Sequence, residues 1–213
     1  MFVVDTYEEI EKNEKRLAEK HIIVLLFVRP SLPGAKEIIE EFEYIHYNSR
    51  KFCSIYAVGY SNDMDCCNKR NWRKVSNMEN DWYYSNQAFV EFKDRLERRL
   101  NWRYSGDVEM IILQSNPEKG NILNFENYLA IDLNYGIQRG YIESFPRFME
   151  SLVRSSRSEV ETVAFTKNMR SGRLKIRQVL ETTLDDCKKV PTPVRRVIKD
   201  RLFYRTARFY SER

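Results

Sequence analysis

Two adjacent cysteines, Cys66 and Cys67, are the residues whose type and spacing come nearest to a reactive site. Neighbouring cysteines can bridge only through a strained ring, or they can act as soft ligands of a metal ion beside Asp63 and Asp65. A zinc site needs further ligands, and no other Cys or His pair at a short spacing occurs in the chain. The pattern therefore favours unpaired loop thiols, and it predicts no metal site and no cofactor.

The sequence carries none of the catalytic motifs with a well-defined mechanism. It has no Gly-x-x-x-x-Gly-Lys phosphate loop, no Gly-x-Ser-x-Gly nucleophile turn and no His-Glu-x-x-His metal motif. His21 begins an apolar segment and His46 lies near the end of a helical pattern, so both are interpreted as structural. No catalytic residue is assigned, and a divergent thiol enzyme that uses Cys66 or Cys67 stays open as an alternative.

The loop Arg29–Gly34 follows the most apolar segment of the chain, Ile22–Val28, and precedes a helical pattern. Loops at the carboxyl end of a central strand, together with the N-terminus of the next helix, form anion and ligand sites in α/β folds. A structural turn is the plainer interpretation of this loop. If a small ligand binds there, we expect Arg29 and Ser31 to contact it.

The C-terminal region is basic and carries aromatic residues among its charges. Residues 154–213 hold 16 Lys+Arg against 7 Asp+Glu, whereas residues 1–153 hold 20 against 24. Arginine and aromatic side chains suit nucleic acid, where they meet phosphates and stack on bases, and they equally suit a protein interface. A third interpretation is that this region only packs on its own domain. The candidate binding residues are Arg195, Arg196, Lys199, Tyr204, Arg205, Arg208 and Tyr210.

Length and composition indicate a folded protein with a sizeable core. The chain has 213 residues, of which 42% are hydrophobic and 13% aromatic. The longest apolar run, Ile22–Val28, is too short to span a membrane, and the first residues do not have the pattern of a secretory signal. Four irregularly spaced cysteines do not suggest a disulfide framework. We therefore expect a cytoplasmic protein that does not bind a membrane.

Apolar patterns predict an α/β fold. Strands are expected over 2–4, 22–28, 54–59, 108–113 and 122–125, and helices over 6–20, 36–48 and 144–153. The continuous apolar run over 22–28 is typical of a strand that is buried on both faces. The pattern over residues 21–60 predicts one β-α-β unit, so helices should flank a central mixed sheet.

The segment Phe27-Val-Arg-Pro-Ser-Leu-Pro-Gly-Ala-Lys36 resembles the Phe-Trp-Ala-x-Trp-Cys-Gly-Pro-Cys-Lys segment of thioredoxin. It has the same place, at the end of the second strand and the start of the second helix. The order strand, helix, strand, helix, strand, hairpin and helix over residues 2–153 is also similar. Leu32 and Ala35 stand where the redox cysteines would be, and no proline precedes Val108, where the family has a cis-proline. The resemblance implies a thioredoxin-like α/β domain without dithiol chemistry.

Residues 64–106 are expected to form a helical insertion, because a minimal thioredoxin unit does not need them. All three tryptophans of the chain lie here, among many arginines and lysines. One helix is clear, with Ser85 as its N-cap. Its apolar stripe consists of Phe89, Phe92, Leu96 and Leu100.

The run Arg154-Ser-Ser-Arg-Ser158 is the candidate boundary between a domain over 1–153 and a basic helical arm over 154–213. Pro191 and Pro193 end one helix of that arm, and a last helix is expected from Val194 to about Tyr210. The leading functional hypothesis is a non-catalytic binding or adaptor subunit of a larger assembly, with a protein partner. The alternative is a nucleic-acid-binding accessory protein.

Overall fold

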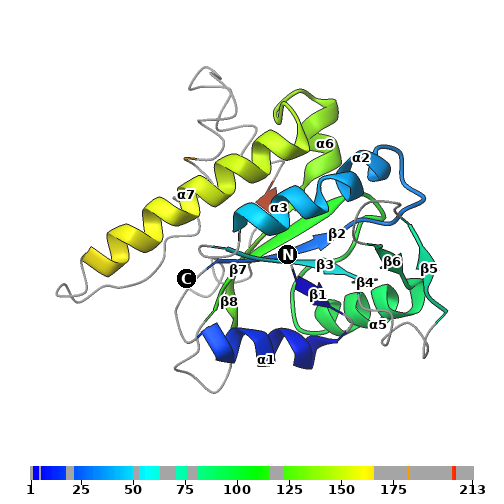
Figure 1. The fold of residues 1–213 in the computed structure, drawn as a ribbon, viewed down its shortest axis with the longest axis horizontal. Coiled ribbons are helices and arrows are strands. Elements are labelled where there is room, and N and C mark those ends of the chain that lie inside the picture. Colours follow the sequence, from blue (N-terminus) through cyan, green and yellow to red (C-terminus); the bar gives the residue numbers. More distant parts are fainter. Residues whose placement is uncertain are drawn as a thin grey trace, which may run out of the picture.

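The computed structural model describes residues 2–4, 6–17, 22–49, 53–62, 71–75, 81–115, 122–165, 182 and 203–204. They form a main sheet in the order β1-β3-β2-β7-β8-β9, with helices on both faces (Figure 1). β2 is parallel to β3 and antiparallel to β7, and β7 is antiparallel to β8. A mixed α/β fold is therefore confirmed. The strands are β1 (Phe2–Val4), β2 (Ile22–Phe27), β3 (Cys53–Val58), β7 (Glu109–Ser115), β8 (Leu123–Asp132) and β9 (Phe203–Tyr204).

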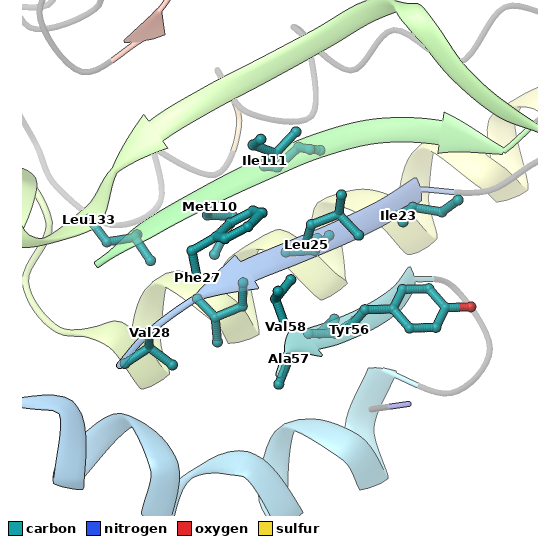
Figure 2. Close-up of a cluster of buried hydrophobic side chains, with 14 of the residues drawn as sticks. Ile23, Leu25, Phe27, Val28, Tyr56, Ala57, Val58, Met110, Ile111 and Leu133 are labelled. Atoms are coloured by element: carbon teal, nitrogen blue, oxygen red, sulfur yellow. The ribbon is translucent and has the colours of Figure 1, made fainter. Parts of the chain in front are cut away.

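β2 lies inside the main sheet, and every one of its residues is buried. Figure 2 shows Leu25 and Phe27 of β2 in the core, together with Val58 of β3 and Met110 of β7. A strand with helices over both faces has no solvent-facing position, so an uninterrupted apolar run is what the fold requires. The predicted central strand over 22–28 is confirmed.

Helices cover both faces of the main sheet, with α1 and α5 on one face and α3 and α7 on the other (Figure 1). The helix expected over 36–48 is divided in the structure. The amide of Glu41 donates to the carbonyls of Ile38 and Ile39, which tightens the last turn of α2, and α3 starts afresh at Phe42. The helices are α1 (Tyr7–Leu17), α2 (Ala35–Glu40), α3 (Phe42–Ser49), α5 (Asn86–Glu97), α6 (Leu133–Gln138) and α7 (Phe145–Phe165).

The segment over 64–106 is not wholly helical, contrary to expectation. Two strands in it, β5 (Arg73–Lys74) and β6 (Tyr83–Tyr84), form a second small sheet with β4 (Tyr60–Ser61) in the order β4-β6-β5. Its one described helix, α5, is capped as predicted, because the Ser85 hydroxyl accepts from the Ala88 amide at 3.3 Å. The apolar stripe of α5 is buried in the main core, so this helix covers the sheet itself.

The helix expected over 144–153 is α7, and it is longer than predicted. It runs through the residues of the expected domain boundary, Arg154–Ser158, and ends at Phe165. Serine at a buried helical position is accommodated by back-bonding, and the Ser156 hydroxyl donates to the Leu152 carbonyl at 2.7 Å. The secondary structure therefore has no break at the expected boundary, and the division into two regions stays a prediction.

The expected last helix, from Val194 to about Tyr210, is wrong at Phe203–Tyr204. These residues form β9, which pairs antiparallel with β8 through Ala130 and Ile131. An open strand edge offers unpaired N–H and C=O groups, and aromatic residues favour strands, which together explain the pairing. Tyr204 thus contributes its backbone to the main sheet. The other candidate residues of the arm lie outside the described residues: Arg195, Arg196, Lys199, Arg205, Arg208 and Tyr210.

A truncation after Lys189 should destabilise the domain, because it removes β9 from the edge of β8. We expect a loss of about 1–2 kcal/mol in the free energy of unfolding, on the order of one or two backbone hydrogen bonds. Hydrogen exchange should also accelerate at the β8 amides around Ala130 and Ile131. Removal of residues 205–213 alone, which keeps β9, is the control. Unchanged exchange in β8 after the longer truncation would contradict the pairing.

Candidate functional site

The loop Arg29–Gly34 makes two tight turns between β2 and α2. The Leu32 amide donates to the Arg29 carbonyl at 3.0 Å, and the Ala35 amide donates to the Leu32 carbonyl at 3.1 Å. Gly34, with φ of 75°, is the N-cap of α2. The turns place Ala35 in the core, and Leu32 packs against it. At the two positions where the resemblance places redox cysteines, Ala35 is therefore part of the hydrophobic core and the partly buried Leu32 packs against that core.

The side chain of Arg29, the first residue of this loop, lies over two aromatic rings. Its Cζ atom is 4.9 Å from the centroid of the Phe89 ring and 5.6 Å from that of the Tyr104 ring. Phe89 comes from α5, and Tyr104 precedes β7, so three separate segments meet here. A guanidinium over the face of an aromatic ring is attracted by the quadrupole of the ring. Ser31, the other residue predicted for this loop, is exposed and does not join the rings.

Arg73 lies over a third ring, that of Tyr84, which is next to Phe89. Arg73 and Tyr84 are directly opposite each other on β5 and β6, and the Arg73 Cζ atom is 5.6 Å from the centroid of the Tyr84 ring. The centroids of Tyr84 and Phe89 are 6.1 Å apart. We call this set the arginine–aromatic cluster. It consists of Arg29, Arg73, Tyr84, Phe89 and Tyr104.

The cluster carries two positive charges without a carboxylate partner among the described residues. Arg29 and Arg73 form no ion pair there, whereas the neighbouring Lys74 pairs with Asp81 at 2.7 Å. Burial raises the pKa of Tyr84 to about 12, and the charges of Arg29 and Arg73 act against that rise. The Tyr84 hydroxyl is therefore protonated at neutral pH.

Two buried polar atoms in the cluster have no hydrogen-bond partner within the described residues. They are the Nε atom of Arg29 and the hydroxyl of Tyr104. Burial, the largest cause, also raises the pKa of Tyr104, so this phenol stays neutral and keeps its proton. An unsatisfied buried donor costs about 1–3 kcal/mol. The cluster is therefore polar and positively charged, and the described residues do not satisfy all of its buried hydrogen-bonding atoms.

A buried carboxyl group, Glu109, lies behind the cluster at the start of β7. Its two oxygens accept from the Trp102 indole at 2.8 Å and from the Ser105 amide at 2.9 Å. Burial raises the pKa of Glu109, and these hydrogen bonds act in the opposite direction. The two bonds hold the chain on either side of Tyr104, at Trp102 and at Ser105, just before β7. Glu109 thus positions the loop that carries one ring of the cluster.

The remaining sequence-predicted candidates do not join this cluster. Cys66 and Cys67 lie outside the described residues. Cys53, which is described, is fully buried, and burial raises its pKa, so it is an unreactive core thiol. No group of three or more His, Cys, Asp or Glu side chains in the described part of the chain could hold a metal ion. Within the same ranges, no helix is long and apolar enough to cross a membrane.

The sequence pattern points to Arg29 but not to the rings that it contacts. Arg73 is one of many basic residues near the tryptophans, and no local pattern distinguishes it from the others. The only sequence signal for the cluster is that many aromatic and basic residues occur together over 64–106. It gives no partner, since each contact joins residues that are far apart in the chain.

Comparison with known proteins adds no relative. No protein-family model matches the chain, and neither a curated protein nor a solved structure is detectably similar to it.

Proposed function

We propose that the protein is a non-catalytic binding subunit, built on a thioredoxin-like scaffold, that acts within a larger assembly. The described elements β1, α1, β2, α2 and β3, followed by the β7–β8 hairpin and α7, agree with the element order on which the resemblance depends. The single observation that carries the proposal is the composition of the loop after β2. Ala35 is buried in the core there and Leu32 packs against it, while Arg29 lies over aromatic rings. The loop is thus suited to holding a ligand rather than to attacking a disulfide.

Introducing two cysteines at these positions should create dithiol chemistry. Leu32→Cys with Ala35→Cys places two thiols around the first turn of α2, where a helix N-terminus lowers a thiol pKa. With dithiothreitol as the reductant, we expect this variant to reduce insulin disulfides faster than dithiothreitol alone, and the unaltered protein to add nothing. Leu32→Ser with Ala35→Ser is the matched control. Turnover by the unaltered protein would overturn the non-catalytic proposal and favour a thiol enzyme.

Affinity capture compares the two surfaces that could bind the partner. The comparison uses Arg29→Gln with Arg73→Gln, charge reversal at Arg195, Arg196, Arg205 and Arg208, and Arg139→Gln as the control. Arg139 also lies over a single tyrosine ring, that of Tyr135, at 5.6 Å, but away from the cluster. A protein retained by the control and lost by either test variant supports the binding subunit. Retention on unrelated nucleic acids that falls steeply with salt supports the alternative instead.

A further inference from the structure

The two arginines of the cluster come from different segments of the chain and lie over adjacent rings, Arg29 over Phe89 and Arg73 over Tyr84, whose centroids are 6.1 Å apart. Arg29 follows the central strand β2, and Arg73 lies on β5, directly opposite Tyr84. Each guanidinium lies over an aromatic ring, and neither has a carboxylate partner in the described part of the chain. Two like charges on neighbouring rings repel each other unless an anion lies between them. The arrangement is therefore more favourable with a bound anion than without one.

We propose that Arg29 and Arg73 together bind the phosphate group of a ligand beside the Tyr84 hydroxyl. The proposal rests on the proposed function, since it names the chemistry that the binding site recognises. Two guanidinium groups match the charge of a phosphate monoester, which carries about −1.5 to −2 at neutral pH, better than that of a single carboxylate. Planar guanidinium groups also bind phosphate oxygens through paired hydrogen bonds.

Tyr84 and Tyr104 supply the neutral donors that such a site needs. Tyr84 is protonated at neutral pH, and its hydroxyl donates to the Asn86 side-chain oxygen only at the long distance of 3.4 Å. The buried Tyr104 hydroxyl has no hydrogen-bond partner among the described residues. The exposure of Arg73 leaves one side of the cluster open to solvent, so a ligand can reach it.

Calorimetric titration of the full chain with inorganic phosphate, against sodium chloride of equal ionic strength, tests the site directly. We expect saturable phosphate binding that weakens at least tenfold in Arg73→Gln and in Arg29→Gln. Arg73→Lys keeps the charge but loses the planar group, so its phosphate affinity should lie between those of the unaltered protein and Arg73→Gln. Arg139→Gln removes a guanidinium from a tyrosine ring elsewhere and should bind like the unaltered protein. Since Arg73 is exposed, its variants should keep the native circular dichroism spectrum, so the test does not depend on the half-buried Arg29.

The source of the phosphate is distinguished by further titrations with glycerol 3-phosphate and with a phosphoserine peptide. Tighter binding of the peptide than of both small phosphates indicates a phosphorylated protein partner, and equal binding indicates a small ligand. Absence of phosphate binding, or equal binding by Arg73→Gln and Arg139→Gln, would overturn the inference and leave the non-catalytic scaffold unaffected. Insulin reduction by the unaltered protein would instead overturn the non-catalytic scaffold and leave the phosphate-binding inference unaffected.

Discussion

Gly59→Ala is expected to destabilise the folded protein by about 2–5 kcal/mol, because two costs coincide at this position. Gly59 has φ of 79°, in the left-handed region that an L side chain rarely adopts. An added Cβ atom would also lie 2.8 Å from the Cβ of Phe89 and 3.0 Å from its Cα. The Gly59 carbonyl accepts from the Ser85 amide at 2.9 Å, so the substitution would separate the end of β3 from the start of α5.

Gly34→Ala is the matched control for this prediction. Gly34 has a similar φ of 75°, but an added Cβ there would meet no atom within 4 Å. It should therefore lose only the conformational cost, about 1–2 kcal/mol. Urea unfolding of both variants, with comparable m-values, separates the two contributions. Equal losses would mean that α5 moves away at little cost and that the contact with Phe89 does not restrain the fold.

Glu109→Ala should cost about 2–5 kcal/mol, since it leaves the Trp102 indole and the Ser105 amide without an acceptor in a buried place. Glu109→Gln keeps the shape and one acceptor oxygen, so its loss should be smaller. The Trp102 fluorescence of both variants reports whether the ring stays in the core. A loss below about 1 kcal/mol in Glu109→Ala would show that the two donors find other acceptors.

The same residue predicts a pH dependence. Because burial raises the pKa of Glu109 in the folded state, the folded protein binds more protons than the unfolded chain above about pH 4.5. Stability should therefore fall, through this group, as the pH rises from about 4.5 to the raised pKa. Glu109→Gln lacks this contribution. Across that pH window, the free energy of unfolding of the unaltered protein should therefore fall relative to that of Glu109→Gln. A difference that does not change with pH would contradict the raised pKa.

The sequence predicted those elements whose signal is local and repeated. The apolar run at Ile22–Val28 requires burial on both faces, and helices on both sides of the sheet provide it. Ser85 and the stripe that begins at Phe89 define α5, because a cap and a helical period both act within a few residues. These predictions needed no knowledge of which element lies beside which.

Predictions failed where pairing with a neighbour overrides local preference. β8 continues past the expected end at residue 125 to Asp132, because Tyr128–Asp132 pair with Glu109–Leu113 of β7, and the register shifts between these pairs and those of Leu123 and Asn124. Phe203–Tyr204 follows the same rule, as the open edge of β8 turns an expected helix into β9.

Sequence alone determined that Leu32 and Ala35 provide no redox chemistry, since this depends only on which side chains are present. Only the tertiary structure determined that an arginine–aromatic cluster forms beside this loop. Arg29 acquires its aromatic contacts from α5 and from the loop before β7, and Arg73 meets Tyr84 through the register of β5 and β6. Such contacts join segments that are distant in the chain, and no local period or motif encodes them. Packing of the whole fold therefore brings these residues together, and their types alone do not determine the contacts.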